Sequence, residues 1–242
     1  MSTPQAAARP SPRRSDAGSV RLTARDVHGL ILCAEHYAAP YDLLAAALCA
    51  SPGRLRGITA RWRRAGYAQT GILGPGPAWC WLTPAGMAAC GYPWPTRPPS
   101  LARLAHIRAV LAARLWLQGT PAYRQADAWW RCERRIRAAL PSNVGAPHIA
   151  DAEICWPSAP PGPHAGQVWA VEVELTPKPA ARTARIMTGL LAGRYAQVVY
   201  LVSPAARPVV TATAGALAGQ HRDRVAVRDL PPQAFLPPAG AR

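Results

Sequence analysis

Residues 51–67 read SPGRLRGITARWRRAGY and form the most informative stretch of the chain. Leu55, Ile58 and Trp62 recur at intervals of three and four residues, and Ala65 continues the series, so these side chains form one apolar stripe of an α-helix. Five arginines flank or oppose that stripe with no acid between them: Arg54, Arg56, Arg61, Arg63 and Arg64. The pattern predicts a helix that is anchored by its apolar face and presents positive charge outward.

Two shorter helices are expected before this basic helix, and a hairpin is expected after it. The helices span about residues 24–37 and 41–49. Residues 69–73 and 79–82 can pair as strands, because the GPGP sequence at 74–77 favours a turn. This order is that of a winged helix-turn-helix, whose basic helix enters the major groove so that arginines reach phosphates and guanine edges.

The sequence LTPAG at residues 82–86 supports the same interpretation. It resembles the strand-to-helix step LTxxG that closes many winged-helix domains, with Thr83 capping a helix that starts at Pro84. We therefore predict that the five arginines bind double-stranded DNA.

The composition also favours a polyanionic partner. The chain has 242 residues, with 28 Lys or Arg against 12 Asp or Glu, which gives a formal net charge of +16. Nucleic acid is the leading candidate, because binding neutralises charge and releases counterions. There is no charged start followed by an apolar stretch, and residues 30–50 are interrupted by charges and proline. We therefore expect a cytoplasmic protein without a membrane partner.

The motifs of several protein classes are missing from the sequence. The six cysteines contain no CxxC pair and have no histidine at zinc-finger spacing, so they are predicted to be reduced core residues and no zinc is expected. Serine-triad, P-loop and dinucleotide-binding patterns are also absent from the sequence.

The predicted architecture is α+β. The chain is divided into a disordered basic tail (1–20), the winged helix-turn-helix (21–91), a proline-rich linker (92–100), an α/β domain with bridging helices and a mixed sheet (101–230), and a second disordered tail (231–242). Within the α/β domain, helices are expected from Leu101 to Leu115 after a Ser100 cap, and over residues 122–140, 180–193 and 209–220; strands are expected near 152–156, 167–175, 198–202 and 225–227.

Acidic residues gather in this second domain of an otherwise basic chain. Asp151, Glu153, Glu172 and Glu174 account for four of the 12 acids. Glu172 and Glu174 lie two apart on one strand and so project from the same face. Two like carboxylates side by side are unfavourable unless a cation or a proton lies between them. Glu153 is expected to face solvent.

The only lysine of the chain follows this pair. Lys178 lies four residues beyond Glu174, although arginine supplies every other basic side chain. An ammonium is a compact charge, whereas a guanidinium is broad, so a site beside a metal and a phosphate can require lysine. Chance survival of one lysine is an equally acceptable explanation.

The order of these residues resembles the PD-(D/E)XK nuclease superfamily. An acid in WWRCERRIR (Glu133), Asp151 before a hairpin, and ExE on the central strand are followed by a helix and a strand. VEVELTPK and the preceding winged helix bring the chain closer to actinobacterial plasmid proteins of the replication-relaxation and mobilisation type, over residues 21–230.

The resemblance implies roles for five residues. Asp151 and Glu172 would be metal ligands. Glu174, which stands where the superfamily usually has lysine, would also contact the metal. Lys178 would supply the displaced ammonium, and Glu133 would complete the catalytic set. The ion would be Mg²⁺ or Mn²⁺, which suit hard oxygen ligands.

Two departures from the superfamily pattern bear on activity. Ala150 replaces the proline that usually precedes the aspartate, and the ExK spacing is lost. Such changes accompany nuclease folds that are kept for binding. His148 and His164 are expected on surface loops and not among the ligands.

Three functions remain open at this point. The first is a DNA-binding accessory of plasmid replication or conjugative mobilisation, with relaxosome or replication proteins as partners. The second is an active metal-dependent endonuclease. The third is a transcription regulator whose second domain dimerises, which would make the protein a homodimer. The displaced lysine favours the first over the second.

Overall fold

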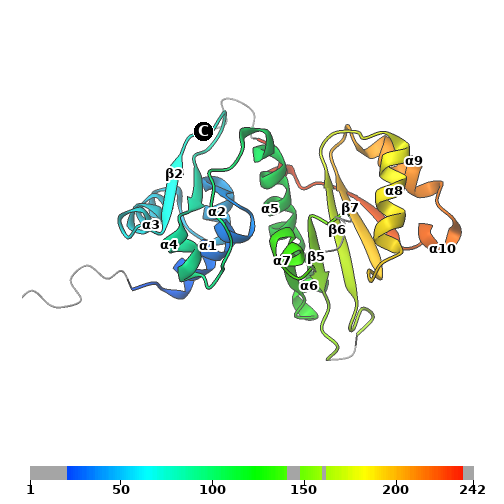
Figure 1. Cartoon of the computed structure of the whole chain (residues 1–242), viewed down its shortest axis with the longest axis horizontal. Coiled ribbons are helices and arrows are strands. Elements are labelled where there is room, and N and C mark those ends of the chain that lie inside the picture. The colour runs from blue at the N-terminus through cyan, green and yellow to red at the C-terminus, as the bar shows by residue number, and fades with distance from the viewer. Residues whose placement is uncertain (1–20, 141–147, 160–161, 237–242) are drawn as a thin grey trace, which may run out of the picture.

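Two β-sheets, each with its own helices, are joined through a long central helix (Figure 1). This α+β arrangement is seen in a computed structural model that describes residues 21–140, 148–159 and 162–236. The first half contains α1 (Ala24–Glu35), β1 (Ala39–Pro40), α2 (Tyr41–Ala47), α3 (Pro52–Arg64), β2 (Ala68–Gly71), β3 (Trp79–Leu82) and α4 (Pro84–Ala89). Residues 1–20, predicted as a basic tail, lie outside the described residues.

The second half is built around the larger sheet. It contains a 3₁₀ turn η1 (Leu101–Arg103), α5 (Leu104–Gln118), α6 (Pro121–Gln125), β4 (Trp129–Cys132), α7 (Glu133–Ala138), β5 (Ala152–Cys155), β6 (Val168–Glu174), α8 (Ala180–Leu191), β7 (Gln197–Val202), α9 (Arg207–Gly215), α10 (Gly219–Arg222), β8 (Val225–Asp229) and η2 (Pro232–Ala234).

Helix α3 forms as its sequence predicts. The Ser51 hydroxyl accepts a hydrogen bond from the Arg54 N–H, and Pro52 occupies the first turn, where a missing N–H has no cost. Leu55 and Trp62 are buried in the core. The helix therefore rests on the expected stripe.

The hairpin and its closing helix also follow the sequence. β2 and β3 are antiparallel, and β1 adds a third strand in the order β1-β3-β2. The Thr83 hydroxyl caps α4 by accepting from the Gly86 N–H at 3.1 Å. A Cβ at Gly86 would lie 1.9 Å from the Tyr67 carbonyl oxygen, so only glycine allows α4 to pack this close.

The five-stranded sheet is mixed and has the order β4-β5-β6-β7-β8. β4, β5 and β6 are antiparallel neighbours, whereas β6, β7 and β8 run parallel, with α8 as the crossover from β6 to β7. Helix α5 covers one face, and α8 and α9 cover the other (Figure 1). Both faces of β6 are consequently buried, including the face that carries the two glutamates.

One hydrophobic core runs from the first half into the second. Trp62 and Leu111 belong to the same buried cluster as Val171 and Leu201. The proline-rich residues 92–100 have no helix or strand, as expected of a connecting segment, but several of them pack between the halves. Tyr92 and Trp94 stack with ring centroids 4.1 Å apart.

Four details of the second half differ from the sequence prediction. The single helix expected over residues 122–140 is wrong, because α6, strand β4 and α7 occupy that region. The helix expected over 209–220 is divided into α9 and α10. Ser100 makes no side-chain cap. Residues 231–236 pack on α5, where the Phe235 carbonyl accepts from Arg108 Nε at 3.1 Å; residues 237–242 lie outside the described part.

Two further observations concern disulfide bonds and membrane-spanning helices. All six thiols are free, and Cys33, Cys80, Cys132 and Cys155 are buried, whereas Cys49 is exposed and Cys90 is half-buried. In the part of the chain that the structure describes, no helix is long and apolar enough to cross a membrane.

Candidate functional site

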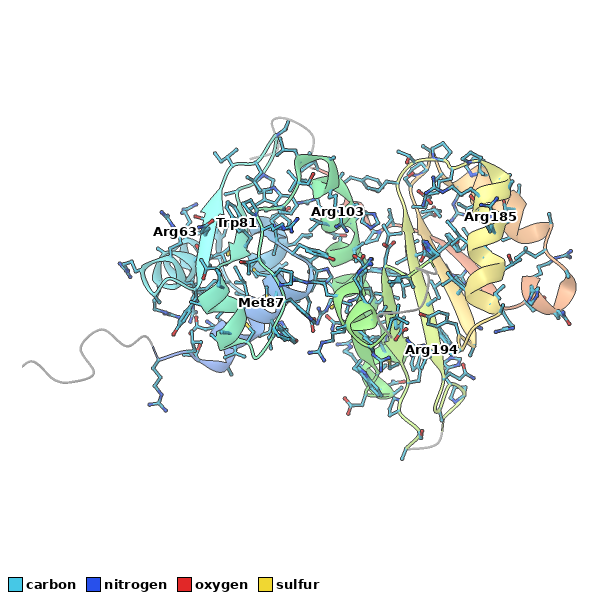
Figure 2. The ribbon with its side chains drawn as sticks, in the orientation of Figure 1. Arg63, Trp81, Met87, Arg103, Arg185 and Arg194 are labelled. Atoms are coloured by element: carbon cyan, nitrogen blue, oxygen red, sulfur yellow. The ribbon has the colours of Figure 1, made fainter. Side chains whose placement is uncertain are left out.

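The outer face of α3 is strongly positive. Arg54, Arg56, Arg63 and Arg64 are exposed. Arg63 points away from the body of the protein (Figure 2). Gly57 lies on the same outer side, and a Cβ there would meet no atom within 4 Å, so a ligand could approach the backbone closely.

Arg61, predicted with the other four, is held by the protein itself. Its guanidinium pairs with Asp26 of α1, whose other hydrogen bonds include one from Trp62 Nε1 at 2.8 Å. Asp26 is 1% exposed. Burial alone would raise the pKa of Asp26, but hydrogen bonds from Thr23, Trp62 and Arg61 lower it. Arg61 therefore fastens α3 to α1, and the other four arginines supply the free positive face.

The acidic residues of the second half meet around one tyrosine. Asp151 immediately precedes β5, while Glu172 and Glu174 lie on β6. Tyr200 of β7 is the register partner of Glu172 and is 1% exposed. Its hydroxyl has no hydrogen-bond partner among the described residues. Burial and then the nearby Glu172, Glu174 and Asp151 carboxylates raise the pKa of Tyr200, so all three carboxylates lie near its hydroxyl. We call these four residues and Lys178 the carboxylate cluster.

Each carboxylate of the cluster has a partner in the protein. Asp151 Oδ1 lies 2.9 Å from His106 Nε2, and Asp151 Oδ2 accepts from the Val173 N–H at 2.8 Å. Glu172 Oε1 lies 2.9 Å from His148 Nε2.

The third carboxylate meets the lysine. The Glu174 Oε2 to Lys178 Nζ distance is 2.5 Å. Burial and the Asp151 carboxylate raise the pKa of Glu172, and His148 and then Lys178 oppose part of that rise. The only lysine of the chain therefore pairs with one of the three carboxylates.

The two histidines were not among the predicted site residues. His148, predicted at the surface, contacts Glu172, and His106 of α5 contacts Asp151. The position of His148 three residues before Asp151 is the one sequence signal that could have suggested it. Nothing local to His106 indicates a partner 45 residues away.

The surroundings of the cluster shift several of its pKa values upward. Burial, reinforced by the nearby Asp151 carboxylate, raises the pKa of Glu172 to about 7. The hydrogen bond with Glu172 raises the pKa of His148. Burial lowers the pKa of His106, but Asp151 more than reverses that effect.

The cluster does not fit a resident metal ion as it is arranged. Among the described residues, no group of three or more His, Cys, Asp or Glu side chains is placed to hold one ion. Lys178, His106 and His148 already contact the three carboxylates. Mg²⁺ or Mn²⁺ binding therefore stays a prediction that this geometry does not favour.

Glu133 lies beside Asp151, whose carbonyl accepts from the Glu133 N–H at 3.1 Å, but its carboxylate pairs with arginines. It begins α7, and its carboxylate accepts from Arg137 at 2.7 Å, from Tyr37 at 3.3 Å and from Arg103 at 3.4 Å. Two of these partners belong to the second half, and Tyr37 belongs to the first. The predicted catalytic role of Glu133 stays a prediction.

The expectation that Glu153 faces solvent is wrong. Its side chain is fully buried, pairs with Arg131 at 2.9 Å and with Arg194, and accepts from the Tyr195 hydroxyl at 2.8 Å. Strand pairing places Arg131 of β4 directly opposite Glu153. Glu153 is therefore a structural ion-pair centre.

Comparison with known proteins gives no family to which the chain can be assigned. No protein-family model matches it, and no curated protein is significantly similar to it.

Stability is expected to fall as pH rises from 5 to 8, and Glu172→Gln should flatten this dependence. A carboxyl whose pKa is higher in the folded protein than in the unfolded chain favours folding below its unfolded pKa and disfavours it above its folded pKa. The raised pKa of His148 acts in the same direction. The part due to Glu172 should be roughly 1–3 kcal/mol over this range.

Urea unfolding of the parent and of Glu172→Gln at pH 5 and pH 8 measures this effect. Comparing the two proteins cancels the contribution of other titrating groups to the pH dependence. His36, whose pKa is lowered by burial, is one such group. An identical pH dependence in both proteins would show that Glu172 is not the group that retains the proton.

Proposed function

We propose that this protein binds double-stranded DNA through α3 and the β2–β3 hairpin, and that its second half is a nuclease-like domain that serves binding without cutting. The observation that carries the proposal is the exposed row of four arginines on a helix whose opposite side is buried. Such a helix can enter the major groove, and the hairpin beside it can reach the backbone as a wing.

The fold of the second half supports the nuclease-like part of the proposal. Three antiparallel strands, a crossover helix and a parallel strand bring Asp151, Glu172 and Glu174 to one sheet end. The contacts of these carboxylates with Lys178 and two histidines favour a domain that does not depend on a metal. The resemblance described above would give such a protein an accessory role in plasmid replication or mobilisation, alongside relaxosome or replication proteins.

A fluorescence anisotropy titration with a labelled duplex tests DNA binding directly. Affinity should fall steeply as salt rises, with a log–log slope of about 0.9 for each phosphate contact. A salt-independent affinity, or no binding at low salt, would contradict the proposal.

A metal-dependent endonuclease is the second candidate, and one observation favours it. Among the described residues, the buried Tyr200 hydroxyl near the carboxylates has no hydrogen-bond partner, and Lys178 pairs with Glu174. An unsatisfied buried hydroxyl is costly, so a bound group could complete this site.

Incubating supercoiled plasmid with the parent protein and Mn²⁺ separates the two candidates. We expect no cutting by the parent. Cutting that falls about 100-fold or more in both Glu172→Ala and Lys178→Arg would instead establish the nuclease, because such a loss is typical of removing one preorganised charge. Cutting that both variants retain would indicate a contaminant.

A further inference from the structure

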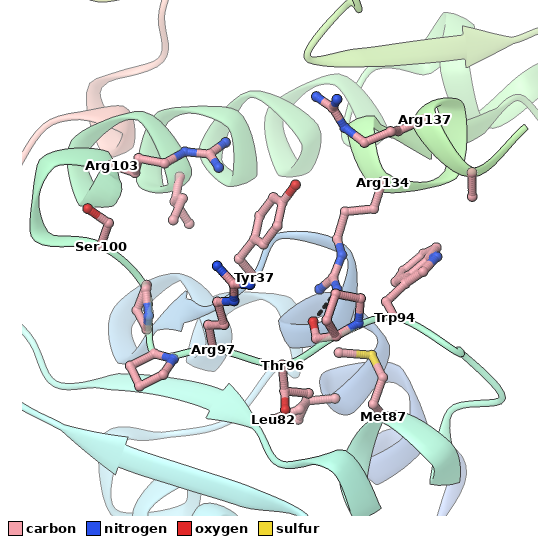
Figure 3. A pocket seen from close by; sticks show the side chains of 15 residues that line it. Tyr37, Leu82, Met87, Trp94, Thr96, Arg97, Ser100, Arg103, Arg134 and Arg137 are labelled. Atoms are coloured by element: carbon pink, nitrogen blue, oxygen red, sulfur yellow. Dashed lines mark hydrogen bonds between the residues drawn. The ribbon is translucent and has the colours of Figure 1, made fainter. Parts of the chain in front are cut away.

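A second positively charged site lies away from α3, between the two halves of the protein (Figure 3). A cavity of about 510 Å³ is enclosed by the end of β3, α4, the proline-rich residues 94–100, the start of α5 and α7. Pockets of ~300–1,000 Å³ hold small organic ligands. The cavity is therefore large enough for one nucleotide.

Arginines dominate the polar lining of this cavity. Arg97, Arg103, Arg134 and Arg137 contribute four guanidinium groups. Glu133 is the carboxylate that pairs with two of them, Arg103 and Arg137. Among the described residues, Arg97 and Arg134 have no carboxylate within ion-pair distance. The cavity thus carries about three uncompensated positive charges.

Arg134 is the strongest indication of an anion. It is only 7% exposed, and it donates to the Ala34 carbonyl at 2.8 Å and the Pro95 carbonyl at 2.7 Å. Its guanidinium lies 4.7 Å from the Tyr37 ring centroid and 4.8 Å from that of Trp94. Carbonyls and rings orient this buried cation without neutralising it, and a buried charge without a counter-charge is unfavourable.

The remaining lining is apolar or aromatic. Leu82, Met87 and Ile107 face the cavity together with Tyr37 and Trp94. In Figure 3, Arg103 and Arg137 reach towards each other across the hydroxyl end of Tyr37. A ligand that suits this cavity must therefore combine an anionic group with a flat or apolar group.

We propose that this cavity binds a nucleoside phosphate, with the phosphate held by Arg97, Arg103 and Arg137 and the base against the apolar lining. Guanidinium groups bind phosphate oxygens in pairs of parallel hydrogen bonds, and their planes also stack on bases. The same chemistry is offered by a free nucleotide and by an unpaired nucleotide of a DNA strand.

Calorimetric titration of the parent protein with deoxyadenosine 5′-monophosphate, deoxyadenosine and inorganic phosphate tests the cavity. The monophosphate should bind at least tenfold more tightly than either fragment. Arg97→Ala/Arg103→Ala should weaken its binding at least tenfold, because two charge-assisted contacts to the phosphate are lost. Arg182→Ala/Arg185→Ala removes two exposed arginines from α8, away from the cavity, and should change nothing (Figure 2).

Two further variants keep the test decisive. Arg103 also lies over the Tyr37 ring, so the single variant Arg97→Ala, which removes no ion pair, serves if the double variant melts at a lower temperature than the parent. Arg56→Ala/Arg63→Ala should lose duplex binding and keep nucleotide binding. Failure of the cavity is thereby distinguished from failure of α3.

A labelled single-stranded oligonucleotide separates the two sources of the nucleotide. If Arg97→Ala/Arg103→Ala weakens its binding more than Arg182→Ala/Arg185→Ala does, the cavity receives an unpaired nucleotide of DNA. If only the monophosphate is affected, the ligand is a free nucleotide. No binding of the monophosphate, binding no tighter than that of phosphate or of the nucleoside, or equal loss in both double variants would overturn the proposal.

Discussion

Arg56→Ala/Arg63→Ala should weaken duplex binding by about 100-fold at moderate salt, because each arginine contact to a phosphate or a guanine edge contributes roughly 1–3 kcal/mol. Both side chains are exposed on the outer face of α3 and neither forms an ion pair among the described residues, so their removal costs the fold little. The magnitude of the log–log salt slope should fall by about two, because two arginines no longer neutralise a phosphate each.

A matched control separates the position of the arginines from the net charge. Arg182→Ala/Arg185→Ala makes the same change of charge on α8, where both side chains are exposed. This variant should keep nearly the parent affinity in the same anisotropy titration. Equal losses in both double variants would mean that the overall charge of the protein, and not α3, governs binding.

Glu35→Ala should destabilise the protein by about 3–5 kcal/mol, the usual cost of removing one partner of a buried ion pair. Glu35 is 4% exposed and accepts from Arg114 Nη1 at 2.6 Å, from Arg135 Nε at 2.9 Å and from the Tyr92 hydroxyl at 3.0 Å. These donors come from α5, α7 and the proline-rich segment. Removal of the carboxylate would leave Arg114, itself 7% exposed, as a buried cation beside a neutral His36.

Urea unfolding followed by tryptophan fluorescence measures this loss. The matched control is Arg207→Ala, which breaks the exposed ion pair with Asp229 and should leave the unfolding midpoint nearly unchanged. Because one core joins the two halves, both variants should still unfold in a single transition. A Glu35→Ala midpoint equal to that of the parent would show that this network does not hold the halves together.

Local patterns were sufficient to predict the helices and the hairpin of the first half, but not the short strand β1, which forms by pairing with β3. These patterns involve residues close together in the sequence: the Leu55–Ile58–Trp62 spacing, the cap at Thr83 and the turn at 74–77. The corresponding elements form as expected. Alternation along β6 likewise placed Glu172 and Glu174 on one face, because side chains two apart on a strand always share a side.

Strand β4 shows where local patterns fail. Its four residues stand between helix-forming segments, and its extended form depends on pairing with β5. Trp130 lies opposite Ile154, a partner that no local pattern identifies. A strand this short is set by its neighbour and not by its own propensity.

The sequence by itself determined the basic helix α3, its hairpin, the α+β class and the shared face of the two glutamates, since each depends on periodicity or on contacts a few residues apart. Only the tertiary structure decided which charges are free. It assigned Arg61 to Asp26, Glu153 to Arg131 and Arg194, and Lys178 and His148 to the carboxylate cluster. Most of these partners are far apart in the sequence. Arg61 and Asp26 are separated by 35 residues, Arg131 and Glu153 by 22, and Arg194 and Glu153 by 41. Only chain folding brings such groups within ion-pair distance. A charge is buried at acceptable cost only where folding also places an opposite charge beside it.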